Sequence, residues 1–255
     1  MAAVLYDTPD VIRSFAEARG IEFPVLSDVG SVAIKRYDLL NREISPDDRL
    51  GDFSPYGIPY PGTFVVDGSG RVVERFFQQR YQERFTASSI FLNLGDRIEG
   101  IDGDAVEIET NHLVALTYGS DAVVAPGNRL SLVVDVTPKP GIHVYAPGDH
   151  LYRVIRVRVD TPNFLRVHAL SYPPSEIYHY QPLDETVPVY QQPSRLVQDV
   201  TIPMIEETAA LSAVSGGRLT VRGALEYQAC DDEVCYIPTE VPLTWEFRWR
   251  PLVRD

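Results

Sequence analysis

The spacing of apolar residues along the chain changes near residue 100. Before this point, apolar side chains recur every three to four positions in some segments and alternate in others, whereas only alternating or β-branched runs follow it. A helix repeats its buried face about every 3.6 residues and a strand every second residue. The change predicts an α/β domain over residues 1–97, a Gly- and Asp-rich linker at 98–105, and an all-β domain over residues 106–255.

The first domain is expected to alternate strands with helices. Thr8 and Pro9 form an N-cap and a first helical position, and Gly20 stands where the C-terminal cap of the same helix belongs. The other expected elements are strands at Ala3–Tyr6 and Phe23–Leu26, a helix at Val32–Leu40, a hairpin of Thr63–Val66 with Val72–Phe77, and a helix at Thr86–Leu94.

The second domain consists of short strand-like segments separated by proline- and glycine-rich turns. This pattern of short strands and turns is typical of an antiparallel β-sandwich. The expected strands are His112–Tyr118, Arg129–Val136, Tyr152–Val159, Leu196–Pro203, Arg218–Tyr227 and Val241–Trp249.

Composition excludes several classes of partner. The net charge is −13 and no run is rich in Lys or Arg, so we expect binding neither to nucleic acid nor to anionic membrane surfaces. No window approaches the roughly 18 apolar residues of a membrane helix, so we expect no membrane insertion. The start, MAAVLYDTPDVIRSF, lacks the basic and apolar regions of a secretory signal, which leaves the cytoplasm open as a compartment.

Two segments of the first domain, VLYDTPDVIRSFAEARGIEFPVLSD and YGIPYPGTFVVDGSG, resemble the C-terminal part of the AhpC/TSA family, whose members are peroxiredoxin-like proteins with a thioredoxin fold. The resemblance covers about residues 3–94 and places Pro61 at the position of a cis-proline. An ordinary trans turn is the alternative. The family's reactive cysteine precedes this region, and the chain has no cysteine before Cys230. We therefore expect a truncated redoxin domain that lacks its first βα unit, with a domain that has lost its chemistry as the alternative. In either case we expect no peroxidase activity from this chain alone.

The second domain contains both cysteines of the chain, Cys230 and Cys235, on either side of the sequence Asp-Asp-Glu-Val. A tight connection between two strands can bring such a pair within disulfide distance. Closing so short a loop stabilises a fold by only about 2 kcal/mol, which favours redox use over a structural bridge without excluding the latter. The intervening acids disfavour a thiolate. Zinc is disfavoured because no second ligand pair stands nearby in the sequence.

The segments GIHVYAPG, LDETVPVY and YQACDDEVCYIPTEVPLTW resemble the N-terminal domain of the DsbD family over about residues 108–250. The resemblance implies an immunoglobulin-like sandwich of the bacterial periplasm that exchanges disulfides with a thioredoxin-like protein or domain. Cys230 and Cys235 would be the redox pair, with Cys235 attacking a partner disulfide first. No cofactor is expected besides this redox-active disulfide.

The same resemblance implies roles for four neighbours of the pair. Asp184 and Glu185 would lie in a covering loop and accept or steer a proton, although a solvated acidic loop is the alternative. Tyr145 would pack beside the disulfide, with His143 as a less specific neighbour. The C-x4-C spacing is one residue shorter than in a known relative. The covering loop lacks that relative's shielding aromatic, which leaves Thr186, Val187 and Tyr190 as substitutes.

These features together predict a thiol–disulfide oxidoreductase or electron relay. In the full-length protein, the missing part of the redoxin domain would be a partner in cis, and the protein would support peroxide reduction. One alternative is a non-catalytic β-sandwich interaction module in which the disulfide is structural. Another is an inert fragment whose first half folds poorly.

Overall fold

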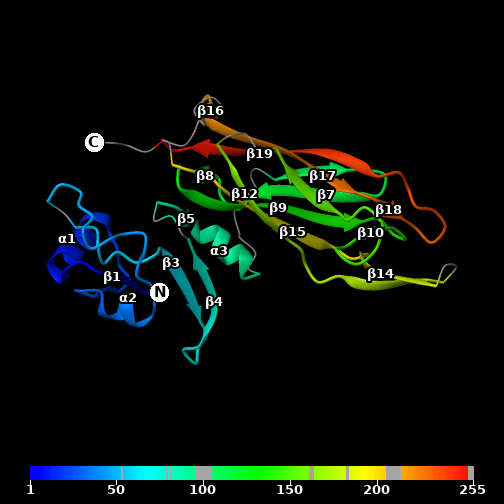
Figure 1. The fold of residues 1–255 in the computed structure, drawn as a ribbon. Coiled ribbons are helices and arrows are strands. Elements are labelled where there is room, and N and C mark those ends of the chain that lie inside the picture. The colour runs from blue at the N-terminus through cyan, green and yellow to red at the C-terminus, as the bar shows by residue number, and fades with distance from the viewer. Residues whose placement is uncertain are drawn as a thin grey trace. The chain divides into compact units, whose positions relative to one another are not determined.

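The computed structural model describes residues 1–52, 54–78, 80, 82–95, 105–160, 164–181, 184–204 and 214–251. The chain divides into two compact units, Met1–Tyr81 and Gln82–Asp255 (Figure 1). Among the described helices, none combines the length and the apolar character that a membrane span requires.

The first unit begins with a parallel β-α-β arrangement. Strand β1 (Ala3–Leu5) pairs with β2 (Val25–Ser27), and helix α1 (Pro9–Arg19) connects them. Gly20 caps the C-terminus of α1 as the sequence predicts, because it adopts φ 61° and its N–H bonds to carbonyls of the last turn. Thr8 stands at the N-cap position, but its side chain makes no capping hydrogen bond. The short helix α2 (Val32–Arg36) follows β2 and ends earlier than the sequence predicts.

A hairpin completes the first unit. Strands β3 (Gly62–Val66) and β4 (Val72–Phe77) pair with each other in a sheet of their own, as expected. The expected cis bond at Pro61 is not found, because the described chain has no cis peptide. The trans bond keeps the backbone extended into β3, and the Pro61 carbonyl accepts the Gln78 N–H at 3.0 Å, which adds a rung to the hairpin.

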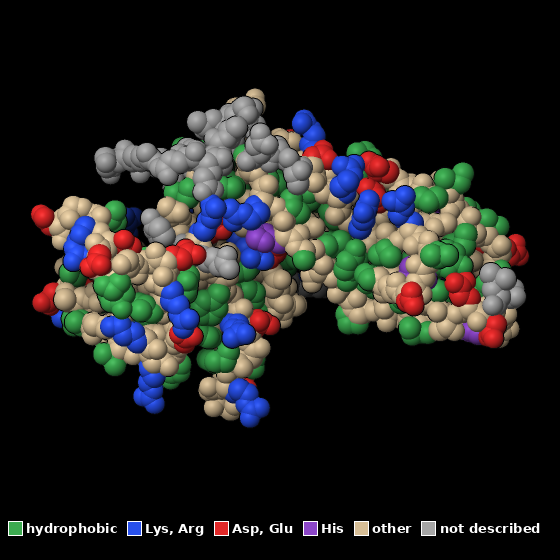
Figure 2. Space-filling view, viewed as in Figure 1, with side chains coloured by type: hydrophobic (Ala, Val, Ile, Leu, Met, Phe, Trp, Pro, Cys, Tyr) green, Lys and Arg blue, Asp and Glu red, His purple; other side chains and the backbone are tan. Residues whose placement is uncertain are grey.

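Little apolar surface is buried in the first unit. Its described residues bury three large apolar side chains, Ile12, Ile34 and Phe76, and two prolines, Pro55 and Pro61. Others stay accessible, including Val4 at 48% and Leu26 at 55%, and hydrophobic side chains lie between charged ones on the face seen in Figure 2. Because burial of apolar area is the main driving force of folding, this unit gains less from it than the second.

The second unit contains two large sheets. One has the order β12 (Arg166–Ser171), β15 (Ser194–Thr201), β9 (Asn128–Pro138), β7 (Leu113–Gly119), β6 (Val106–Glu109), with β5 (Arg84–Phe85) added in parallel to β9. The other has the order β11 (Arg156–Val159), β17 (Arg218–Tyr227), β19 (Thr239–Trp249), β8 (Val123–Val124), with β16 (Val214–Ser215) paired to β17.

These two sheets face each other across the core of the second unit. Alternate side chains of β9 point into it, and so do alternate side chains of β17 and β19, as the period of two requires. The core includes Leu130, Leu132, Val134 and Val136 from β9, Leu219, Val221 and Leu225 from β17, and Leu243, Trp245 and Phe247 from β19. The expected antiparallel β-sandwich is confirmed.

Helix α3 (Ala87–Asn93) packs on the sandwich. Its N-cap Thr86 accepts the Ser89 N–H, and the hydroxyl of Ser89 lies 2.8 Å from that of Ser131 on β9. The sequence places this helix in a first domain ending at residue 97. In the structure, the polar contact to β9 and the pairing of β5 with β9 join the segment from Gln82 onward to the second unit. Residues 98–104 of the predicted linker lie outside the described residues.

A third, smaller sheet lies at one end of the sandwich. Its order is β13 (Glu176–Tyr180), β14 (Glu185–Tyr190), β10 (His143–Tyr145), β18 (Ala229–Cys230) (Figure 1). Strand β10 pairs with β18 so that His143 stands opposite Cys230. Because β18 follows the central strand β17 almost directly, the sandwich core fixes the place of the first cysteine.

Candidate functional site

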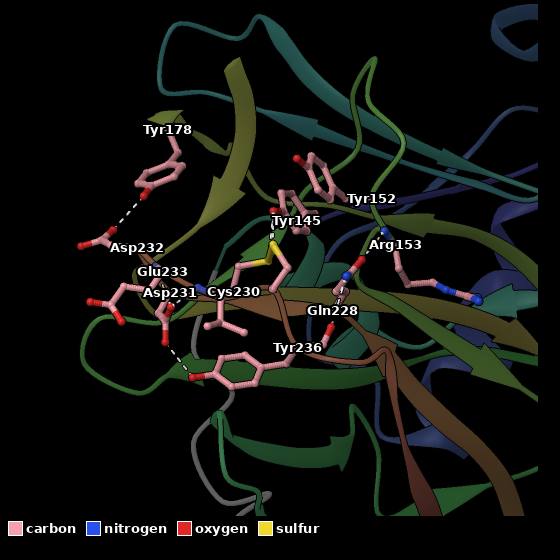
Figure 3. Close-up of a disulfide and its surroundings, with 12 residues drawn as sticks. Tyr145, Tyr152, Arg153, Tyr178, Gln228, Cys230, Asp231, Asp232, Glu233 and Tyr236 are labelled. Carbon is pink, nitrogen blue, oxygen red and sulfur yellow. Dashed lines mark hydrogen bonds between the residues drawn. A yellow bond between two sulfur atoms is a disulfide. The ribbon is translucent and has the colours of Figure 1, made fainter. Parts of the chain in front are cut away.

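Cys230 and Cys235 form a disulfide whose Cα atoms are 4.1 Å apart (Figure 3). Cys230 ends β18, the four residues after it turn the chain back, and Cys235 forms an antiparallel bridge with Cys230. The pairing expected across this connection is therefore present in the structure.

The two cysteines differ in their exposure to solvent. Cys230 is only 1% exposed and packs in a cluster with Tyr145, Val187 and Val189, whereas Cys235 is exposed. A thiolate arriving from outside can therefore approach the Cys235 sulfur, and Cys230 is the natural leaving group.

Tyr145, the last residue of β10, contacts both sulfurs. Its hydroxyl lies 3.1 Å from Sγ of Cys230 and 3.4 Å from Sγ of Cys235. Burial raises the pKa of Tyr145 well above its ordinary value, and the nearby Tyr152 and Glu185 raise it further. The phenol therefore keeps its proton and can donate it in a hydrogen bond to a thiolate formed at Cys230.

Tyr152 covers Tyr145 on the side away from the disulfide (Figure 3). The two rings are stacked with centroids 4.2 Å apart and planes only 3° apart. The Tyr152 hydroxyl donates to Oε2 of Glu185 at 2.6 Å, and this bond raises the pKa of Tyr152. The sequence did not single out Tyr152, because it was expected to begin a strand that in the structure starts only at Arg156.

His143 lies beside the pair and is 2% exposed. Its ring centroid is 4.4 Å from that of Tyr178 and 5.5 Å from that of Tyr145. Burial lowers the pKa of His143, and the negative charges of Asp232 and Asp231 oppose this only in part. His143 is therefore a neutral ring at pH 7 that packs between two tyrosines.

The structure separates the two acids expected in the covering loop. Glu185 lies in the site and bonds to Tyr152, whereas the side chain of Asp184 is 95% exposed and lies 3.6 Å from the His179 ring. Among the three candidate shielding residues, Val187 packs in the cluster with Cys230. The other two bond elsewhere: Thr186 is within hydrogen-bond distance of His179, and Tyr190 donates to the Pro173 carbonyl.

The acids between the cysteines make specific hydrogen bonds. Asp231 accepts the hydroxyl of Tyr236 at 2.7 Å, and this bond together with two backbone N–H donors lowers the pKa of Asp231. Asp232 accepts the hydroxyl of Tyr178 at 2.7 Å, and this raises the pKa of Tyr178 to about 12 (Figure 3). Sequence reasoning treated these acids only as charges and did not anticipate their bonds.

A hollow of about 220 Å³ opens over the disulfide, and its lining includes Tyr145, Tyr152, Tyr178, Val234 and Cys235. This volume is below the roughly 300–1,000 Å³ of typical small-molecule sites.

Residues 1–75 match the family model of the AhpC/TSA family. Residues 115–243, just over half of the chain, match the model of the N-terminal domain of thiol:disulfide interchange protein DsbD. The chain belongs to the DsbD N-terminal family. Membership in the DsbD N-terminal family, together with the Cys230–Cys235 disulfide, supports thiol–disulfide exchange as the general chemistry of the pair.

Two solved structures are similar to the chain. The N-terminal periplasmic domain of ScsB from Proteus mirabilis is 15% identical with a TM-score of 0.36; the match covers 55% of this chain and 50% of that one. The DsbD N-terminal domain of Neisseria meningitidis in the reduced form is 16% identical with a TM-score of 0.30, covering 60% of this chain and 98% of that one. The chain thus spans about half the length of the ScsB domain. No curated protein matches it.

Proposed function

We propose that Cys230 and Cys235 are a redox pair that exchanges disulfides with a thioredoxin-like protein or domain. The observation that supports this most directly is the arrangement of one exposed cysteine, one buried cysteine and a phenol within reach of both sulfurs. A purely structural bridge needs neither an accessible sulfur nor a hydrogen-bond donor at its leaving group. We also propose that the sandwich is immunoglobulin-like.

In the reducing direction, a partner thiolate attacks Sγ of Cys235. The bond between the two sulfurs breaks, a mixed disulfide forms at Cys235, and Cys230 leaves as a thiolate that accepts a hydrogen bond from Tyr145. The partner's second thiolate then attacks the partner's own sulfur in the mixed disulfide and releases Cys235. Two electrons have passed to the pair, two protons are taken up by its sulfurs, and the partner holds the new disulfide.

The reverse sequence passes electrons onward. The Cys235 thiolate attacks the disulfide of an oxidised partner, and the Cys230 thiolate resolves the mixed disulfide. In this proposal Glu185 steers protons in both directions, and its hydrogen bond to Tyr152, which stacks on Tyr145, supports this role. The exposed Asp184 contributes negative charge at the rim, and His143 acts as packing beside Cys230.

The first unit is proposed to be a partial redoxin domain of the thioredoxin type. The family match at residues 1–75 supports this, and so do the parallel β1–β2 pair and the β3–β4 hairpin. The unit contains no cysteine, so peroxide reduction requires a thiolate supplied from elsewhere. If a redoxin thiol is available in cis, the pair at Cys235 would exchange with it.

Trapping of a mixed disulfide tests the proposal. A thioredoxin with its second active-site cysteine replaced by serine is mixed with the Cys230→Ser variant of the full chain after activation of Cys235 by an aromatic disulfide. We expect a covalent complex through Cys235, found by mass spectrometry, and far less from the matched Cys235→Ser variant, whose remaining sulfur is buried. Equal trapping by both variants, or by neither, would contradict the proposal.

A further inference from the structure

The turn between the two cysteines is held together by bonds that do not involve sulfur. Oδ1 of Asp231 accepts the backbone N–H of Glu233 at 2.8 Å and that of Val234 at 2.6 Å. Oδ2 of the same carboxylate accepts the hydroxyl of Tyr236 at 2.7 Å. An aspartate that bonds to backbone groups two and three residues ahead is a common turn former. One side chain therefore ties together both ends of the connection.

Two backbone hydrogen bonds, one on each side of the disulfide, also hold this turn. The N–H of Asp231 donates to the carbonyl of Val234 at 3.0 Å inside the turn, and the N–H of Tyr236 donates to the carbonyl of Ala229 at 2.9 Å outside it. These two bonds bracket the Cys230–Cys235 bridge. Neither bond involves a sulfur atom, so breaking the disulfide does not remove either of them directly.

A second carboxylate attaches the turn to the small sheet. Asp232 accepts the hydroxyl of Tyr178 on β13 (Figure 3). The ring of Tyr178 in turn packs on His143 of β10. The tip of the connection is therefore anchored outside its own hairpin. A loop anchored in this way loses little conformational entropy when its cysteines meet, because most of that entropy is already absent.

We propose that Asp231 is a positioning residue that keeps the two thiols of the reduced pair side by side and thereby favours closure of the disulfide. The inference deepens the proposed redox function and rests on it. Turn and disulfide both require the same closed backbone, so each stabilises the other by an equal coupling free energy. Loss of the carboxylate must therefore make the disulfide easier to reduce.

The charge of Asp231 offers a competing explanation that variants can separate. Asparagine keeps an oxygen that accepts the two backbone N–H groups but removes the charge. Glu233 is an exposed acid in the same turn, so Glu233→Ala removes an equal charge and leaves the side-chain bonds of Asp231 in place. Asp231→Ala removes both the charge and the bonds.

The test is equilibration of the full chain with glutathione redox buffers, followed by alkylation and mass spectrometry to give the oxidised fraction. We expect Asp231→Ala to lower the equilibrium constant for disulfide formation about tenfold, which corresponds to ~30 mV. Asp231→Asn should stay within about threefold of the wild type, and Glu233→Ala should match it. Hydrogen exchange of the reduced chain should show a protected Val234 amide that loses protection in Asp231→Ala.

An unchanged constant in Asp231→Ala would overturn the inference. A loss in both Glu233→Ala and Asp231→Asn as large as that in Asp231→Ala would also overturn it, because charge would then be the cause. An unprotected Val234 amide in the reduced wild type would show that the turn does not persist. Glutathione is the only exchange partner in this test, so its outcome is separate from whether a thioredoxin-like protein can be trapped at Cys235.

Discussion

The hydroxyl oxygen of Tyr145 lies 3.1 Å from Sγ of Cys230, the buried sulfur of the disulfide. A sulfur that leaves as a thiolate in such a place has lost most of its contact with water. The phenol replaces part of that hydration with one fixed donor, whose proton is held firmly because burial raises the pKa of Tyr145. The position of Tyr145 on β10 should therefore affect how fast the disulfide is reduced.

Removal of this hydroxyl should slow reduction of the disulfide. A hydrogen bond to a charged group is worth about 1.5–3 kcal/mol, so Tyr145→Phe should slow reduction by dithiothreitol at pH 7 by roughly tenfold to a hundredfold. Tyr190→Phe is a matched control, because it removes a hydroxyl that bonds to the Pro173 carbonyl. Stopped-flow mixing measures both rates. Equal rates in the two variants would exclude the role of Tyr145.

The difference in exposure between the two sulfurs should appear in their reactivity. In the reduced chain under native conditions, iodoacetamide should modify Cys235 at least about tenfold faster than Cys230, because a buried thiol is reached only after local opening. Peptide mass spectrometry over a time course measures this ratio. In urea the two cysteines should react alike, which serves as the internal control. A faster Cys230 would reverse the assigned order of attack.

Acidification should destabilise the second unit. Burial lowers the pKa of His143 and of His168 below 6.5, so near and below that pH the unfolded chain binds protons that the folded chain does not. The stabilisation that comes from keeping these two histidines neutral is therefore fully present above about pH 6.5. It is lost as the pH drops towards their folded-state pKa values. Urea midpoints at pH 7 and pH 5.5, followed by fluorescence of Trp245 and Trp249, measure the loss. His143→Phe should make this loss of stability smaller without abolishing it, because His168 still contributes. A stability that rises on acidification would refute the prediction.

Helix α3 should contribute to the stability of the sandwich through a buried polar contact. Ser131 is fully buried, and its hydroxyl lies 2.8 Å from that of Ser89 and donates to Asp199 at 2.7 Å. Ser131→Ala should cost about 1–3 kcal/mol because Asp199 then loses a donor in a buried place. In a double-mutant cycle of urea unfolding, Ser89→Ala and Ser131→Ala should couple by about 1 kcal/mol. Additive effects would mean that α3 does not depend on this contact.

Sequence reasoning succeeded where local signals define an element. Helix α1 has a proline at its start and a glycine at its end, and both act over one turn of chain. Strands β17 and β19 alternate over ten or more residues, which fixes their buried face. Such elements carry their own boundaries in the sequence.

Elements that depend on distant partners were missed or misplaced. Strands β10, β13 and β14 are short and lie at the end of the sandwich, so their pairing decides their conformation. The predicted helix at Val32–Leu40 ends at Arg36, and Leu40 instead forms a bridge with Pro59. Helix α3 was predicted, but no local signal shows that Ser89 bonds to Ser131 rather than within the first unit.

Sequence reasoning identified some residues of the site and missed others. Cys230 and Cys235 stand out because they are the two cysteines of the chain, and family resemblance adds Tyr145 and Glu185. Tyr152 and Tyr178 come from other segments, and no periodicity marks them. The acids of the turn were visible in the sequence, but their role depends on which donors face them, and only the folded geometry shows this.

The reduction potential of the Cys230–Cys235 pair tests the central claim most directly. Equilibration of the full chain with glutathione and dithiothreitol buffers, read out by alkylation and mass spectrometry, gives this value. A pair that cycles with a thioredoxin-like partner should have a potential of roughly −200 to −270 mV. A potential below about −300 mV, with the sulfurs still joined under reducing conditions that open thioredoxin, would show a permanent structural bridge and contradict the account.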